Sequence, residues 1–60
     1  MKRRDLDRRL RQLGWTLVRH GGRHDLWTDG RTYEAVPRHA DIHERLALAI
    51  LARAQRRSRR

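Results

Sequence analysis

The stretch that decides the fold is WTLVRHGGRHDLWTDGRTYEAVP, residues 15–37. It contains three short runs of strand character, which are Trp15 to His20, Arg23 to Thr28 and Arg31 to Val36. Gly21-Gly22 offers a tight turn, and Asp29-Gly30 is a strong hairpin signal because a type I′ turn needs positive φ at both positions. Pro37 ends the third run because proline lacks a backbone donor. The stretch predicts a three-stranded antiparallel meander.

Apolar residues at helical spacing flank this stretch on both sides. Leu6, Leu10 and Leu13 mark one face of a helix over residues 5–13, and Gly14 follows as its C-cap. Asp41 with Glu44 indicates the start of a second helix, which has apolar residues at Ile42, Leu46, Ala49, Ile50 and Ala54. The predicted order is α-β-β-β-α, an α+β fold with both helices on one face of the sheet.

Two-residue turns at both hairpins would set the register of the strands. One sheet face would then hold most of the apolar residues and meet the helices, namely Trp15, Leu17, Leu26, Tyr33 and Ala35. Trp27 would lie on the exposed face, free to stack a base or bind a partner. Arg19 would lie beside His24, where a neighbouring cation favours the neutral imidazole that a general base needs.

Charge and composition narrow the function. The 60 residues carry sixteen Lys and Arg against seven Asp and Glu, a formal net charge of +9. The absence of cysteine excludes a disulfide framework and a zinc ribbon, and fits the cytoplasm. The implied partner is a polyanion: nucleic acid first, an anionic membrane surface second and an acidic protein third. We expect one domain over residues 1–54 and a disordered basic tail over residues 55–60.

The predicted register gathers candidate site residues at one end of the sheet. They are Arg19, Gly22, Arg23, His24, Arg38 and His39. RNA cleavage without a metal needs a base for the 2′-hydroxyl proton, a cation for the phosphorane charge and an acid for the leaving oxygen. His24 as base, Arg23 or Arg38 as cation and His39 as acid would supply these roles. The alternatives are a packed or surface histidine and a solvated arginine cluster.

A metal site is the other interpretation of the histidines. His39, Asp41 and His43 lie close together in the sequence, but Asp41 is better used to cap the second helix. His39 then lies outside that helix, and no third ligand is fixed. We therefore expect no metal and no cofactor.

Four stretches resemble the HicA toxins of bacterial toxin–antitoxin pairs, over about residues 2–54. They are LRQLGW at 10–15, Gly22-Arg23-His24 where the family shows Gly-Ser-His, Val36-Pro37-Arg38-His39 for Val-Pro-x-His, and the second helix at 46–54. The resemblance implies a double-stranded-RNA-binding-domain-like fold that cleaves mRNA and is neutralised by a HicB antitoxin. It also maps the catalytic histidine onto His24. Arg23 and Asp25 depart from the family, which has Ser and a second His there.

These observations together predict a toxin that is a metal-independent endoribonuclease. His24 would be the base, His39 the candidate acid, and the RNA-binding residues would be Arg19, Gly22, Arg23, Arg38 and His39. The alternatives are a non-catalytic RNA-binding module of the same fold and a basic docking protein for an acidic partner. RNA cleavage would distinguish the ribonuclease toxin from both alternatives. Salt-sensitive RNA binding without cleavage would distinguish the RNA-binding module from the docking protein.

Overall fold

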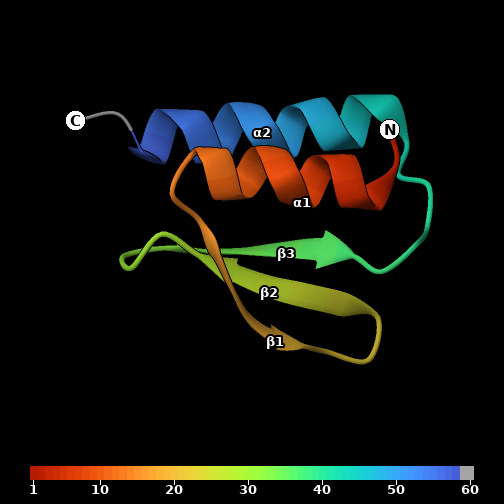
Figure 1. Ribbon diagram of the computed structural model, residues 1–60, viewed down its shortest axis with the longest axis horizontal. Helices are drawn as coiled ribbons and strands as arrows, with labels where there is room; N and C mark the ends of the chain where they lie inside the picture. The colour runs from red at the N-terminus through yellow and green to blue at the C-terminus, as the bar shows by residue number, and fades with distance from the viewer. Residues whose placement is uncertain (59–60) are drawn as a thin grey trace.

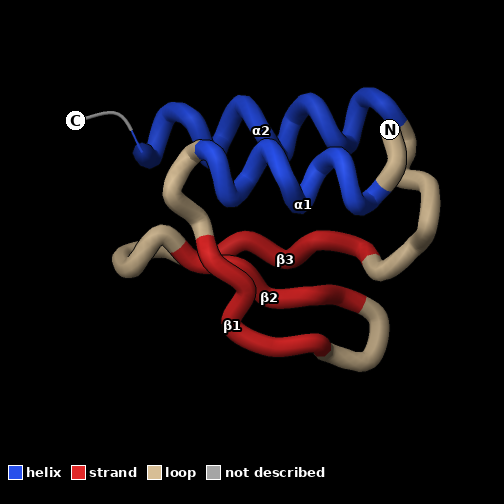
Figure 2. The backbone as a smooth tube through the Cα atoms, viewed as in Figure 1, coloured by secondary structure: helices blue, strands red, loops and turns tan. Residues whose placement is uncertain are grey.

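Two helices and a three-stranded sheet form two layers in the computed structural model, which describes residues 1–58 (Figure 1). The elements in chain order are α1 (Arg3–Gln12), β1 (Thr16–His20), β2 (His24–Thr28), β3 (Tyr33–Pro37) and α2 (Glu44–Ser58). The strands are antiparallel in the order β1-β2-β3, and both helices lie on the same side of the sheet (Figure 2). The predicted α-β-β-β-α fold is confirmed. Neither helix among the described residues has the length and apolar character to cross a membrane.

Gly14 ends α1 and turns the chain into β1. It adopts a φ of +91°, its N–H donates to the Arg11 carbonyl (3.0 Å), and the Trp15 N–H donates to the Leu10 carbonyl (3.0 Å). These are the two hydrogen bonds of a Schellman motif, which needs a left-handed residue at this position. The predicted C-cap is therefore confirmed, and it delivers Trp15 to the core, where it is buried.

The start of α2 differs from the prediction. Asp41 does not cap the helix but forms an isolated β-bridge with Lys2, next to a hydrogen bond from the Ile42 N–H to the Met1 carbonyl (2.7 Å). The helix begins at Glu44, and the preceding His43 accepts a hydrogen bond on Nδ1 from the Arg45 N–H (3.3 Å). The capping-box prediction is wrong because the segment before the helix is used to pair with residues 1–2.

The end of α2 also corrects an expectation. The helix continues to Ser58, so residues 55–58 are helical and not a disordered tail, while residues 59–60 lie outside the described residues. Arg56 and Arg57 stand in the last turn, where positive charge is favourable to the helix dipole. Arg57 also forms an ion pair with Glu34 on β3 (2.8 Å), which ties this turn to the sheet.

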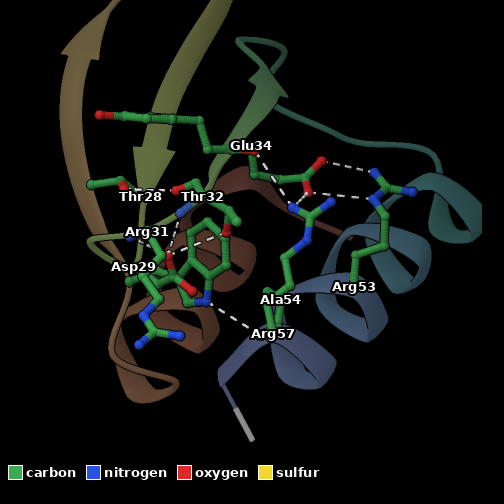
Figure 3. Close-up of polar contacts among 10 residues, drawn as sticks. Thr28, Asp29, Arg31, Thr32, Glu34, Arg53, Ala54 and Arg57 are labelled. Carbon is green, nitrogen blue, oxygen red and sulfur yellow. Dashed lines mark hydrogen bonds and ion pairs between the residues drawn. The ribbon is translucent and has the colours of Figure 1, made fainter. Parts of the chain in front are cut away.

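The β2–β3 connection is a four-residue loop rather than the predicted two-residue turn. Thr28 pairs with Tyr33 across it. The Asp29 carboxylate accepts hydrogen bonds on Oδ1 from the N–H groups of Arg31 (2.9 Å) and Thr32 (2.8 Å), as Figure 3 shows. These bonds, the one from Thr32 foremost, hold the pKa of Asp29 below its ordinary value. The carboxylate satisfies the loop backbone, so the loop can be longer than a type I′ turn.

The helices cover the sheet face that the sequence placed in solvent. Asp25 and Trp27 on β2, with Glu34 and Val36 on β3, are buried under the helices, whereas Tyr33 is 62% exposed. The apolar core consists of Leu6, Leu10, Trp15, Trp27, Val36, Ile42, Ala47, Ile50 and Ala54. The predicted face is wrong, and so is the exposed role of Trp27, whose ring has the Arg11 guanidinium 5.0 Å from its centre.

Paired charges explain how this face can be buried. Glu34, only 8% exposed, binds Arg53 through Oε1 (2.9 Å) and Arg57 through Oε2 (2.8 Å), and Figure 3 shows both guanidinium groups reaching it from α2. The hydrogen bond to Glu34 raises the pKa of Arg53 above its ordinary value. Asp25 is paired in the same way at the other end of the face. A buried carboxylate is tolerated when cations satisfy it.

Candidate functional site

A groove of about 620 Å³ opens at the end of the sheet where β2 begins and β3 ends. Its walls are Gly22, Arg23, His24, Pro37, Arg38, His39 and Leu46. The structure thus brings together Gly22, Arg23, His24, Arg38 and His39, which the sequence had named as site residues. Leu46 is an addition from α2, so the groove runs from the β1–β2 hairpin to the second helix.

The hairpin between β1 and β2 places His24. The Gly21 N–H donates to the His24 carbonyl oxygen (2.8 Å), which closes the hairpin immediately before β2. A Cβ atom on residue 21 would overlap that same carbonyl oxygen, so only glycine allows the two backbones to approach this closely. His24 then pairs with Pro37 on β3, and its side chain is exposed. The imidazole is therefore accessible on a backbone fixed from two sides.

Arg38 is the cation whose orientation is best defined in the groove. Its Nε is 3.2 Å from Oδ1 of Asp25, and its Nη1 donates to the Gly21 carbonyl (2.9 Å). Its backbone N–H donates to the Arg23 carbonyl (3.1 Å), which joins the segment after β3 to the hairpin. These contacts occupy Nε and one hydrogen of Nη1, so Nη2 keeps its donors for a phosphate oxygen. Arg23 is exposed on the same wall.

Arg19 does not lie where the sequence placed it. The β1–β2 connection is longer than the predicted two-residue turn, because His20 pairs with Asp25 across it and Arg19 therefore pairs with Leu26. Arg19 does not line the groove, and the expectation that it neighbours His24 across the strands is wrong. A β-bulge between Leu17 and Arg19 adds a further shift of the register, which places Leu17 opposite Trp27.

Asp25 contacts the groove residue Arg38, and the sequence interpretation did not name it among the candidate site residues. It is 2% exposed, and its Oδ1 lies 2.9 Å from His20 Nδ1 and 3.2 Å from Arg38 Nε. Its place on the buried face beside Trp27 follows from strand alternation once the correct face is chosen. The available signal was the family position itself, where Asp25 stands in place of a second histidine.

The residues considered for a metal lie in three different settings. His39 lines the groove, Asp41 bridges to Lys2, and His43 accepts a hydrogen bond at the start of α2. Within residues 1–58, no three histidine, cysteine or acidic side chains are close enough together to hold a metal ion. The groove itself presents two histidines beside a guanidinium that Asp25 holds in place, and such side chains can support proton transfer beside positive charge.

Comparison with known proteins identifies a family for this chain. The family model that describes the HicA toxin of bacterial toxin–antitoxin systems matches residues 3–55. No curated protein and no solved structure matches the sequence significantly. Because the family match runs from α1 through most of α2 and includes the whole groove, the chain belongs to the HicA toxin family.

Proposed function

We propose that this toxin is an endoribonuclease that cleaves mRNA without a metal ion, with His24 as the base. The observation that carries the proposal is the groove, where the exposed His24 shares a wall with Arg38, a guanidinium held in place by Asp25 and Gly21. Membership of a toxin family supports the toxic role. Among the described residues that line this groove, the histidines are the side chains of the type that most often acts as a general base or acid.

The proposed reaction begins when His24 takes the proton of a ribose 2′-hydroxyl. The 2′ oxygen then attacks the adjacent phosphorus, and negative charge accumulates on the phosphorane oxygens. Arg38, with Arg23 beside it, stabilises that charge through its free N–H donors. His39 lies in the same groove and is the proton donor that the sequence suggests for the leaving 5′ oxygen. The other RNA contacts in the proposal are Gly22 in the groove and Arg19 outside it.

The proposal includes a protein partner. A toxin–antitoxin family implies an antitoxin. We propose that this antitoxin is HicB-like and inhibits cleavage in the cytoplasm, where the mRNA is found. The formal charge of +9 favours a partner surface that is acidic, since opposite charges speed association.

Substitution of His24 tests the proposal. His24→Ala should lower RNA cleavage by about 10²- to 10⁴-fold, the usual effect of losing a general base, and should abolish growth arrest on expression. The matched control is His43→Ala, which removes another exposed histidine that does not line the groove. Equal cleavage by the wild type and His24→Ala would refute the assignment. Salt-sensitive RNA binding by the wild type with no cleavage would favour the RNA-binding module instead.

A further inference from the structure

His20 does not line the groove itself, but it is held by a buried carboxylate that also binds the groove residue Arg38. His20 Nδ1 is 2.9 Å from Oδ1 of Asp25. The Asp25 side chain is 2% exposed, whereas that of His20 is 59% exposed. An ionised carboxylate can only accept, so Nδ1 carries the proton of this hydrogen bond and the ring orientation is fixed. The other ring nitrogen, Nε2, is then the one available to a substrate.

The His20 side chain is linked to the groove through the same oxygen atom. Oδ1 of Asp25 also lies 3.2 Å from Arg38 Nε, so the imidazole and the guanidinium are neighbours around one acceptor. Arg38 lines the groove together with His24. The hydrogen bond from the Gly21 N–H to the His24 carbonyl joins the residue after His20 to the base itself (2.8 Å). His20, the last residue of β1, and His24, the first of β2, therefore lie on the two strands of one closed hairpin.

His39 lacks such support. It lies in the loop that follows β3, and within residues 1–58 no hydrogen bond or ion pair holds its side chain. A proton donor must be held within reach of the leaving oxygen while the bond breaks, and a free side chain loses rotamer entropy to get there. Catalytic histidines are commonly oriented by a carboxylate on the second ring nitrogen. This arrangement is present at His20.

We infer that His20, and not His39, gives the proton to the leaving group, with Asp25 as its positioning residue. This rests on the proposed ribonuclease function. His24 accepts the 2′-hydroxyl proton while the 2′ oxygen bonds to phosphorus. The bond from phosphorus to the 5′ oxygen breaks and its electron pair stays on that oxygen. His20 enters this step as an imidazolium with a proton on each ring nitrogen, and its Nε2 proton passes to the oxygen while the Nδ1–H stays hydrogen-bonded to Asp25. The products are a 2′,3′-cyclic phosphate and a 5′-hydroxyl, and proton exchange with water resets both histidines.

A substrate that needs no acid tests the inference. The RNA bond that the wild type cleaves is synthesised again with sulfur in place of the 5′ oxygen, because a thiolate leaves without a proton. His20→Ala should cleave ordinary RNA about 10²-fold more slowly than the wild type, and the sulfur substrate at the wild-type rate. His24→Ala should remain slow on both, since the base is still required.

Each other outcome has a definite meaning. If His20→Ala cleaves ordinary RNA at the wild-type rate, the inference is overturned. If His20→Ala is slow on the sulfur substrate as well, the inference is also overturned, because His20 would then have a purely structural role. Rescue by sulfur of His39→Ala, and not of His20→Ala, would assign the acid to His39. Absence of cleavage by the wild type would overturn the proposed function and this inference together, whereas the other results concern His20 alone.

The role of Asp25 has its own comparison. Asp25→Asn keeps the side-chain shape but removes the charge that holds both His20 and Arg38. Its rate on ordinary RNA should fall more than its rate on the sulfur substrate, because part of the defect passes through the proton donor. Glu34→Gln is the matched control, since it neutralises the other buried carboxylate on the same sheet face. It should leave the ratio of the two rates unchanged, and an equal ratio in Asp25→Asn would remove Asp25 from the proposed role.

Discussion

Gly21 allows the sharpest test of how the hairpin positions His24. Replacing it by alanine places a Cβ atom against the His24 carbonyl oxygen, a backbone atom that cannot rotate away. The hairpin must open to relieve this overlap. Opening weakens the Gly21–His24 hydrogen bond (2.8 Å) and the bond from Arg38 to the Gly21 carbonyl (2.9 Å). We therefore expect Gly21→Ala to lower the free energy of unfolding and to displace the groove residues His24 and Arg38.

The magnitude follows from the bonds that are lost. A neutral hydrogen bond contributes about 1 kcal/mol and one to a charged donor about 1.5 kcal/mol, and the exposed position of Arg38 reduces the second. Gly21→Ala should therefore lower the free energy of unfolding by about 2 kcal/mol. In a domain of this size that corresponds to a fall in Tm of roughly 10 °C. The rate of RNA cleavage should fall as well, because the backbone that carries His24 moves.

Two other glycines provide the controls. A Cβ atom on Gly22 would have no heavy atom within 4 Å, so Gly22→Ala should change stability by less than about 0.5 kcal/mol. Gly14 also has open space but a φ of +91°, so Gly14→Ala should cost about 1–2 kcal/mol from backbone strain alone. Urea unfolding followed by the fluorescence of the buried tryptophans measures all three. Equal stability of Gly21→Ala and Gly22→Ala would refute the hairpin geometry.

Two further predictions concern carboxylates under the helices. Glu34→Gln should lower the free energy of unfolding by about 1–2 kcal/mol, since it weakens the ion pairs with Arg53 and Arg57. The effect is modest because both arginines are partly exposed and their charges are screened by solvent. A double-mutant cycle with Arg53→Ala that shows no coupling energy would contradict this prediction. Burial raises the pKa of Asp7 above 3.8, and its Oδ1 is buried with no hydrogen bond among the described residues. The folded state thus binds this proton more tightly and loses stability as pH rises above 3.8, so Asp7→Asn should raise the urea midpoint at pH 7 and not at pH 3. An equal effect at both values would argue against the burial penalty.

The sequence contained enough information for the element order and for most of the groove. The leucine spacing before Gly14 and the turn residues at 21–22 and 29–30 depend on local geometry, which propensity captures. Gly22 and Arg23 lie in the first turn, His24 begins the second strand, and Arg38 and His39 directly follow the third strand. Any antiparallel meander of this order brings these two segments to the same end of the sheet. The sequence therefore predicted correctly that these residues lie together, although the predicted strand register was wrong.

The buried face was not predictable from the same local pattern. A count of apolar residues predicted that Trp27 is exposed to solvent, because Asp25 and Glu34 share its sheet face and make that face look polar. Those carboxylates can be buried because they are paired, Glu34 with Arg53 and Arg57, and Asp25 with Arg38 and His20. The loop length was missed for a related reason, since the Asp29 side chain takes over backbone donors that a tight turn would leave unpaired. Both errors arise from side-chain interactions that the spacing of apolar residues along the sequence does not reveal.

The two buried carboxylates bind different arginines, so different parts of the positive charge of the chain have different roles. A charge of +9 on its own suggests one undivided attraction to a polyanion. Glu34 engages Arg53 and Arg57 to fix α2, so these arginines serve the fold first. Asp25 instead holds a guanidinium that also lines the groove. Because the same carboxylate binds His20, neutralising it changes a cation and a candidate proton donor together. Loss of Glu34 is thus expected to act on stability, and loss of Asp25 on the chemistry of the groove.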